Sequence, residues 1–437
     1  MPTLLGLDIG SSSVIAGILR GKNVIATAPR MFFRSRCEGA RVEVDPEDLL
    51  AAVKRAIAGL EGKAEKVDAI ALAVMCPAWV AMDRDGKALT PLVTHQDRRS
   101  VAIAEDIEER VGKKRHLNIV GCRPFPGGIS STTWAWYLKN EPQRLRKADL
   151  VGHLNTFLHR QITGARVIDP SNASFTGLYR TLKLDGWSDE LCDAIGAKRS
   201  LLPGVIEADR IAGHVNAAAA RQFGLREGTP MMTGIIDGSA GMLLAGTTPG
   251  QLFNVCGSTD VLALLTDNPR PHERLLTRAL GIGKKWLAVS TLAAVASALY
   301  WAREQFFRDF TTEQFIAEMF RLAKLGKKAS GGVTFDPYMA GERTSIVQRQ
   351  GAYRNLTLAT TREHMLSAII ESLITASAER LPLLQATGTK LLQNVAVSGG
   401  GDRLDKLMRR DWQGKWIFRA VTDATMRGLG TITPRDS

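Results

Sequence analysis

The alternation of apolar and polar positions predicts that the chain opens with a β-meander. Apolar runs cover Thr3 to Asp8, Val14 to Leu19 and Val24 to Ala28, and short polar stretches separate them. Short apolar runs bounded by turn residues are typical of buried strands. The first turn, Gly10-Ser11-Ser12-Ser13, has neither the GxGxxG nor the GxxxxGK[ST] spacing, so it is not a Rossmann or Walker loop.

A change of period then marks a helix. Asp45 and Pro46 are typical of a helix start, apolar residues recur on one face from Leu49 to Leu60, and Gly62 is expected to end the helix. Val67 to Met75 follows as a buried strand. This strand–helix–strand order after a meander predicts an α/β architecture with a mixed sheet.

The second half of the chain repeats the opening in outline. Strands are predicted from Gln251 to Val255 and from Val261 to Leu265, around the turn Gly257-Ser258-Thr259-Asp260. We therefore predict two related domains, 1–246 and 247–437, each with a hairpin suited to binding phosphate. An ordinary polar hairpin turn is the alternative for each of these short motifs.

Two more elements are predicted near the end of the chain. Apolar spacing from Thr360 to Leu381 predicts one long amphipathic helix, with Pro382 near its end. A short strand from Asn394 to Val397 leads into Ser398-Gly399-Gly400-Gly401, where glycines let a ligand approach the backbone closely. A flexible loop is the alternative interpretation of the three glycines.

Composition narrows the function classes. With 437 residues the chain exceeds the size of one ordinary core, and 57 Lys and Arg against 44 Asp and Glu give a net charge of +13. The basic residues are scattered in short clusters without interleaved aromatics, which argues against a nucleic-acid partner. The five cysteines show no CxxC or zinc spacing. No signal peptide or membrane span is evident, so we expect a cytoplasmic protein.

One carboxylate stands out as a candidate general base. Asp237 follows the apolar run that ends at Ile236 and lies within Gly234 to Gly241, where small residues allow a substrate to approach. A surface turn is the alternative. Asp8, just before the first glycine–hydroxyl turn, is placed to hold a hydrated Mg²⁺ over phosphates.

Taken together, these motifs resemble the FGGY family of carbohydrate kinases, in the actin/hexokinase-like ATPase superfamily. The resemblance runs from Leu5 to about Gly430, and the motifs occur in the family's order. They are Leu5 to Ser13, Gly164 with Asp169-Pro170-Ser171-Asn172-Ala173-Ser174, Trp187 to Leu191, Leu202-Pro203, Gly228-Thr229-Pro230 with Gly234 and Asp237, Gly257-Ser258-Thr259, Phe335 to Thr344, and Val397 to Gly401.

The resemblance implies two actin-like (ribonuclease H-like) domains, each a mixed β-sheet flanked by helices, with a cleft between them. It implies transfer of the γ-phosphoryl group of ATP to a ketose or polyol hydroxyl, with ATP and Mg²⁺ as cofactors and a possible homodimer as the assembly. Asp237 would be the base and Asp8 the metal residue, acting through water. The phosphates and adenosine would contact Gly10, Ser11, Ser12, Ser13, Gly257, Ser258, Thr259, Gly399, Gly400 and Gly401.

The sugar side of the site is assigned to Cys76, His95 and Asp97. Each has an alternative: a buried thiol for Cys76, a hydrogen-bonded structural histidine for His95, and for Asp97 an ion pair with Arg98 or Arg99 that fixes the loop. Positions 75–77 and 95 differ from the Gln-Met-His and Trp of xylulokinases, which argues against xylulose.

Two further departures from the family pattern keep a second hypothesis open. Ile15 stands where many members carry Lys or Arg, and the chain ends at Ser437, soon after a stretch, Gly428-Leu429-Gly430, that resembles the start of the family's final helix. We therefore expect that helix to be truncated or absent. A nucleotide-dependent sugar-binding sensor with weak or no catalysis is the alternative function.

Overall fold

The structure is a computed structural model that describes residues 1–342, 344–347, 349–399 and 402–436. It divides into two compact units. Unit 1 contains Met1–Thr248, Leu265–Leu287 and Asp423–Ser437, and unit 2 contains Pro249–Leu264 and Ala288–Thr422. The chain thus leaves unit 1 and returns to it twice, whereas the sequence pattern predicted a single boundary, after residue 246.

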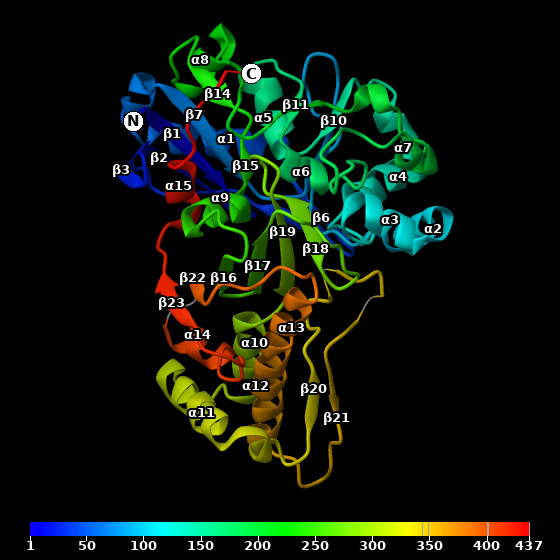
Figure 1. The fold of residues 1–437 in the computed structure, drawn as a ribbon, viewed down its shortest axis with the longest axis vertical. Coiled ribbons are helices and arrows are strands. Elements are labelled where there is room, and N and C mark those ends of the chain that lie inside the picture. Colours follow the sequence, from blue (N-terminus) through cyan, green and yellow to red (C-terminus); the bar gives the residue numbers. More distant parts are fainter. Residues whose placement is uncertain (343, 348, 400–401, 437) are drawn as a thin grey trace. The chain divides into compact units, whose positions relative to one another are not determined.

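The main sheet of unit 1 carries the predicted meander (Figure 1). Its strands are β1 (Thr3–Ile9), β2 (Ser13–Arg20), β3 (Asn23–Thr27), β4 (Met31–Phe32), β7 (Ala69–Val74), β13 (Ile211–His214), β14 (Pro230–Met232) and β15 (Ile235–Ile236). The order is β13-β14-β7-β1-β2-β3, with β15 paired to β7 and β4 paired to β2. Because β1 is antiparallel to β2 and parallel to β7, the sheet is mixed, as predicted.

Burial explains why β1 is central. Leu4, Leu5, Leu7 and Ile9 are all at most 1% exposed, so both faces of this strand are covered. In contrast, β3 alternates between exposed and partly buried positions, as a strand near the sheet's edge does.

The remaining elements of unit 1 surround this sheet. A second sheet has the order β10-β8-β9-β6-β5, and β11 pairs with β12. The strands are β5 (Ser35–Glu38), β6 (Arg41–Val44), β8 (Ala78–Met82), β9 (Leu92–Thr94), β10 (Leu150–Gly152), β11 (Val167–Ile168), β12 (Gly204–Val205) and β18 (Leu276–Ala279). The helices are α1 (Pro46–Ala58), α2 (Val101–Val111), α3 (Lys113–Val120), α4 (Ser130–Asn140), α5 (Leu154–Ile162), α6 (Pro170–Ser174), α7 (Asp189–Ile195), α8 (Ala217–Phe223), α9 (Asp237–Ala245) and α15 (Ala424–Leu429).

The first predicted helix has the expected start and an earlier end. The Asp45 carboxylate accepts a hydrogen bond from the Glu47 N–H at 2.9 Å, which confirms the predicted cap of α1. The predicted end at Gly62 is wrong, because the helix stops at Ala58. After Gly59 the backbone continues in tighter turns, with the Leu60 N–H bonded to the Ile57 carbonyl at 3.0 Å.

Unit 2 repeats the strand pairing of the meander. Its strands are β16 (Leu252–Cys256), β20 (Thr334–Asp336), β21 (Ala352–Arg354), β22 (Asn394–Gly399) and β23 (Ile417–Ala420), and the chain passes between units within β17 (Asp260–Thr266) and β19 (Trp286–Leu292). Antiparallel β16 and β17 form the second hairpin, and β16 is parallel to β22 as β1 is to β7. Its helices are α10 (Ala296–Phe306), α11 (Thr312–Leu325), α12 (Arg362–Ala378), α13 (Arg380–Gln385) and α14 (Asp402–Met408).

The long helix predicted from Thr360 to Leu381 is in fact two helices. The first, α12, ends at Ala378, and α13 follows and contains Pro382. Proline has no backbone N–H to donate to the carbonyl four residues earlier, which here is that of Ala378. The helix therefore ends at that carbonyl.

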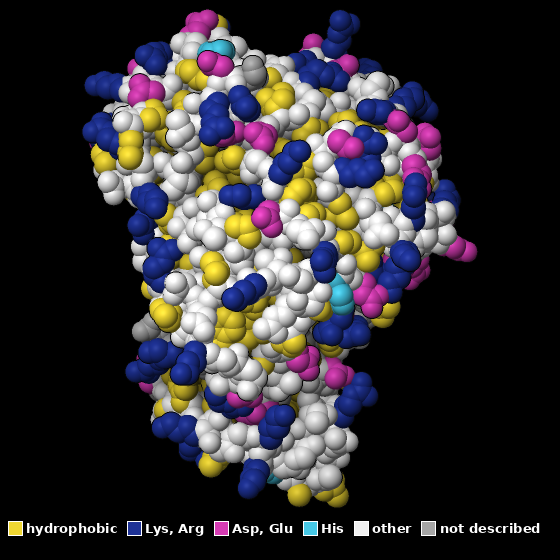
Figure 2. Space-filling model, in the orientation of Figure 1, with side chains coloured by type: hydrophobic (Ala, Val, Ile, Leu, Met, Phe, Trp, Pro, Cys, Tyr) yellow, Lys and Arg dark blue, Asp and Glu magenta, His cyan; other side chains and the backbone are white. Residues whose placement is uncertain are grey.

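The surface agrees with the scattered charge seen in the sequence. On the face shown in Figure 2, Lys and Arg side chains lie singly or in small groups among acidic and uncharged ones. Within the part of the chain that is described, no helix has both the length and the apolar character needed to cross a membrane.

Candidate active site

Three polar side chains lie at the ends of neighbouring strands in unit 1. Ala73 of β7 pairs with Asp8 of β1 on one side and with Ile235 of β15 on the other. These strands are parallel, so their carboxyl ends point the same way. Asp237 directly follows β15, and Cys76 follows β7 by two residues. The edge of a parallel sheet at its carboxyl ends is the usual place for a ligand in an α/β protein.

The predicted first phosphate loop connects β1 to β2. The Gly10 N–H donates to the Ser13 carbonyl at 3.0 Å, which closes a tight turn. Ser11 and Ser12 are exposed, whereas Ser13 is buried. The Ser13 hydroxyl accepts a hydrogen bond from Nη1 of Arg30 at 3.0 Å. Two serines and a guanidinium are thus available beside Asp8.

The Asp8 carboxyl holds its proton unusually well. Burial raises the pKa of Asp8 from 3.8 to about 7, and the nearby charge of Asp237 adds to this, while Arg30 opposes it. A group with this pKa is about half protonated at neutral pH. A divalent cation at Asp8 would have to compete with that proton.

Asp237 is the first residue of α9. The Gly238 N–H donates to its Oδ1 atom at 2.6 Å and helps to orient the carboxylate. The start of α9 places the carboxylate at the positive end of the helix dipole, where negative charge is favoured. The helix ends at Ala245, before Gly246.

A buried arginine lies next to Asp237 and was missed in the sequence analysis. Arg278, on β18, is 5% exposed, and its Nη1 donates to Ser239 Oγ and to the Ala279 carbonyl. Burial lowers the pKa of Arg278 to about 10, and the nearby charges of Asp237 and Asp169 oppose that change. The feature of the sequence that could have marked Arg278 is a single charged residue within a short apolar strand.

Cys76 belongs to a hydrogen-bonded line of side chains. Its Sγ lies 3.5 Å from Nδ1 of His153, whose Nε2 lies 2.6 Å from Oγ of Ser130. Burial lowers the pKa of His153 to about 3 and raises that of the Cys76 thiol, so both groups are neutral at ordinary pH. The predicted thiol thus lies near Asp237, held by a histidine that the sequence analysis did not single out.

Asp169, which precedes the Ser171-Asn172-Ala173-Ser174 stretch, helps to hold the backbone next to Asp237 in place. It is fully buried and caps α6, accepting from the Ser171 N–H at 2.8 Å and from Asn172 Nδ2 at 2.6 Å. The Ser171 hydroxyl also accepts a hydrogen bond from the Ile236 N–H at 3.2 Å. This contact ties α6 to the residue just before Asp237.

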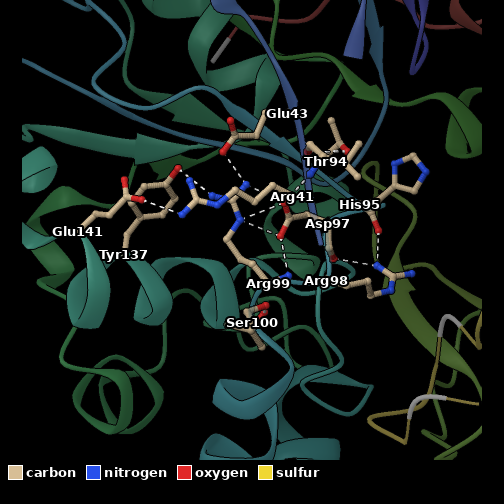
Figure 3. Close-up of polar contacts among 12 residues, drawn as sticks. Arg41, Glu43, Thr94, His95, Asp97, Arg98, Arg99, Ser100, Tyr137 and Glu141 are labelled. Carbon is tan, nitrogen blue, oxygen red and sulfur yellow. Dashed lines mark hydrogen bonds and ion pairs between the residues drawn. The ribbon is translucent and has the colours of Figure 1, made fainter. Parts of the chain in front are cut away.

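Asp97 lies in a separate polar network (Figure 3). Its buried carboxylate accepts from the Val42 N–H at 2.8 Å and pairs with Arg99 at 2.7 Å, and Arg99 also pairs with Glu43 at 2.5 Å. These contacts favour the alternative in which Asp97 fixes its loop, and its assignment to the sugar stays a prediction.

His95 is the third residue assigned to the sugar. It is partly buried, and its carbonyl accepts from Arg98 Nη1 at 2.9 Å (Figure 3). Its role in binding sugar likewise stays a prediction.

The second predicted phosphate loop lies in unit 2, between β16 and β17. The Gly257 N–H donates to the Thr259 carbonyl at 2.7 Å, which closes the turn. The Ser258 carbonyl accepts from the Val295 N–H at 2.8 Å, which places the loop against the start of α10. A Cβ atom added to Gly257 would meet no atom within 4 Å, so there is open space beside the loop.

The predicted adenosine loop is only partly described. Gly399 has a φ of +99°, and a Cβ atom there would come within 2.3 Å of the Cys256 carbonyl oxygen, so this position requires glycine. Gly400 and Gly401 lie outside the described residues.

A short helix near the C-terminus packs against the element that begins with Asp237. The stretch that resembles the family's final helix forms the short helix α15, which packs on α9 in unit 1. Gly428 makes this close approach possible, since a Cβ atom there would lie 1.9 Å from the Ala240 carbonyl oxygen. This helix supports the element that begins with Asp237.

Known protein families and curated proteins resemble this chain over most of its length. The FGGY family of carbohydrate kinases matches over residues 3–244 with its N-terminal domain and over residues 252–410 with its C-terminal domain. The xylulose kinase of Escherichia coli is 26% identical over 91% of this chain and 82% of its own length, and the gluconokinase of Bacillus subtilis is 25% identical over 85% and 74%.

Solved structures show the same fold. The xylulose kinase of Rhodospirillum rubrum has a TM-score of 0.86 at 24% identity, over 98% of this chain and 88% of its own. The Plasmodium falciparum glycerol kinase, solved with ADP, has a TM-score of 0.84 at 17% identity, over 99% and 89%. The predicted fold of two actin-like mixed α/β domains is confirmed, and the chain belongs to the FGGY family of carbohydrate kinases.

Proposed function

We propose that this carbohydrate kinase transfers the γ-phosphoryl group of ATP to a hydroxyl of a ketose or polyol, with Asp237 as the general base. The main support for this proposal is that Asp8 and Asp237 both lie at the carboxyl ends of strands that flank β7. Phosphoryl transfer requires mainly positioning and neutralisation of charge, and one base suffices for the acceptor's proton.

The residues around Asp237 suit an acceptor hydroxyl. Gly238 has no side chain to obstruct the approach, and its N–H holds one carboxylate oxygen. A Cβ atom at Gly238 would lie 3.3 Å from Nη2 of Arg278, so the guanidinium borders the same space. We assign to Asp237 the acceptance of the hydroxyl proton, and to Arg278 and Cys76 hydrogen bonds that position the acceptor.

The hydroxyl loops suit the phosphates of ATP. The exposed Ser11 and Ser12 hydroxyls and the open space beside Gly257 leave room for phosphate oxygens. Gly10 to Ser13 and Gly257 to Thr259 would each donate to the phosphate chain from backbone and side chain. Gly399, the last residue of β22, would begin the loop that contacts adenosine.

Asp8 is the residue best suited to Mg²⁺. The described residues contain no group of three or more His, Cys, Asp or Glu that could enclose a metal ion. A cation held by one carboxylate, water and substrate phosphates is the usual arrangement for Mg²⁺. When bound, Mg²⁺ would neutralise phosphate charge, and Asp8 would hold it through water.

The test is ADP release across a panel of ketoses and polyols, with Asp237→Ala as the blank. Loss of a positioned base is expected to lower the rate by about 10²- to 10⁴-fold. Asp267→Ala, which removes an exposed carboxylate of unit 1, should keep the wild-type rate. An Asp237→Ala variant as active as the wild type would exclude this base, and sugar binding without ADP production would favour the sensor.

A further inference from the structure

Arg30 is held firmly beside the first phosphate loop by the backbone on both sides of it. Strand β4 follows directly and pairs with β2, so that Phe32 lies opposite Ser13. The Phe33 N–H donates to the Ser12 carbonyl at 3.1 Å, and before Arg30 the Ala28 N–H donates to the Ala16 carbonyl at 2.9 Å. The position of Arg30 is therefore fixed by the sheet.

The Arg30 side chain keeps most of its hydrogen-bonding capacity. The residue is exposed, and its Nη1 donates to Ser13 Oγ at 3.0 Å. Among the described residues, Ser13 is the hydrogen-bond partner of the Arg30 side chain. No described carboxylate forms an ion pair with this guanidinium. A guanidinium carries five N–H donors in a planar fork that matches phosphate oxygens.

The charges around the loop show what is missing without Arg30. The Gly10 to Ser13 turn contains no cation, and Ile15, which pairs with Asp8 across the hairpin, is apolar. Asp8 and Asp237 both add negative charge nearby. Phosphates bound at this loop would add further negative charge. An arginine that contacts the transferred phosphoryl group stabilises the negative charge on its oxygens.

We propose that Arg30 binds the phosphate chain of the nucleotide at the Gly10 to Ser13 loop and supplies the cation that the loop itself lacks. Ser13 orients the guanidinium, which leaves its other N–H groups to the phosphate oxygens. This inference depends on the proposed function for the identity of the nucleotide. The alternative is a solvated arginine that only braces the Ser13 hydroxyl.

The test compares Arg30→Gln and Arg30→Lys with Arg34→Gln, which removes another exposed arginine of the same segment. Affinities for ATP and for adenosine are measured by calorimetry, and kcat and KM for ATP and acceptor are measured by ADP release. A charged hydrogen bond of this kind corresponds to about 10- to 100-fold in affinity. We expect Arg30→Gln to lose that much for ATP and nothing for adenosine, with an unchanged KM for the acceptor.

The outcomes separate this inference from the proposed function. Arg30→Lys should retain part of the ATP affinity, because it keeps the charge but loses the planar fork. ATP affinity within twofold of wild type in Arg30→Gln, or an equal loss in Arg34→Gln, would overturn the role of Arg30 while leaving the kinase assignment intact. Calorimetry still tests Arg30 if the wild type phosphorylates no sugar in the panel, and a wild type that binds no ATP would overturn both. Equal melting temperatures would show that all variants fold.

Discussion

Replacing Asp8 with asparagine should stabilise the protein above pH 7 relative to acid pH. The pKa of Asp8 is raised from 3.8 to about 7 by burial and by Asp237. Between these values the folded state binds a proton that the unfolded chain has released, so wild-type stability falls as pH rises. Above pH 7 the wild type has lost this part of its free energy of unfolding in full. The Asp8→Asn variant does not lose it, because asparagine carries no charge.

The expected size follows from the pKa values. The full rise corresponds to ~4 kcal/mol at 1.36 kcal/mol per pKa unit, and about 3 kcal/mol of it falls between pH 5 and pH 8. For a unit of this size, 1 kcal/mol shifts the melting temperature by roughly 2–4 °C. The difference in melting temperature between Asp8→Asn and wild type should therefore grow by about 6–12 °C between pH 5 and pH 8.

Circular dichroism melts at pH 5, 6, 7 and 8, without nucleotide or Mg²⁺, measure this difference. Asp267→Asn controls for the loss of one negative charge at an exposed position. In an Asp237→Asn background the effect should shrink, because the charge of Asp237 is the second cause of the raised pKa. A difference that is the same at all four pH values would show that burial does not hold the proton on Asp8.

Two further predictions concern stability. The side chains of Arg380 and Asp260 are 3% and 1% exposed and form an ion pair at 2.5 Å. Arg380→Met should lower the free energy of unfolding by about 3–5 kcal/mol, because it leaves the buried charge of Asp260 unpaired. Urea unfolding measures this free energy, and a loss below about 1 kcal/mol would contradict the prediction. Gly428→Ala should destabilise unit 1 by about 1–3 kcal/mol, because the added Cβ atom would clash with the Ala240 carbonyl oxygen. Gly204→Ala, whose nearest contact would be 3.6 Å away, is the control, and equal melting temperatures for the two variants would refute the clash.

Local patterns in the sequence predicted several elements of the candidate site. The meander, its glycine–hydroxyl turn and the Asp45 cap each depend on residues close together in the chain. Periodicity, caps and turn residues report such short-range preferences. The same reasoning failed at the ends of α1 and α12, where turn geometry and a proline determine which backbone bonds form.

The sequence alone predicted two hairpins with glycine–hydroxyl turns and a carboxylate, Asp237, among small residues. The phosphate-binding and base roles of these residues stay predictions. Tertiary structure decided what surrounds them. Pairing of β1 and β15 with β7 brings Asp8 and Asp237 together across more than two hundred residues, and packing adds Arg30, His153 and Arg278. No local pattern marks such partners, because their positions depend on long-range strand pairing and burial, and these exist only in the folded chain.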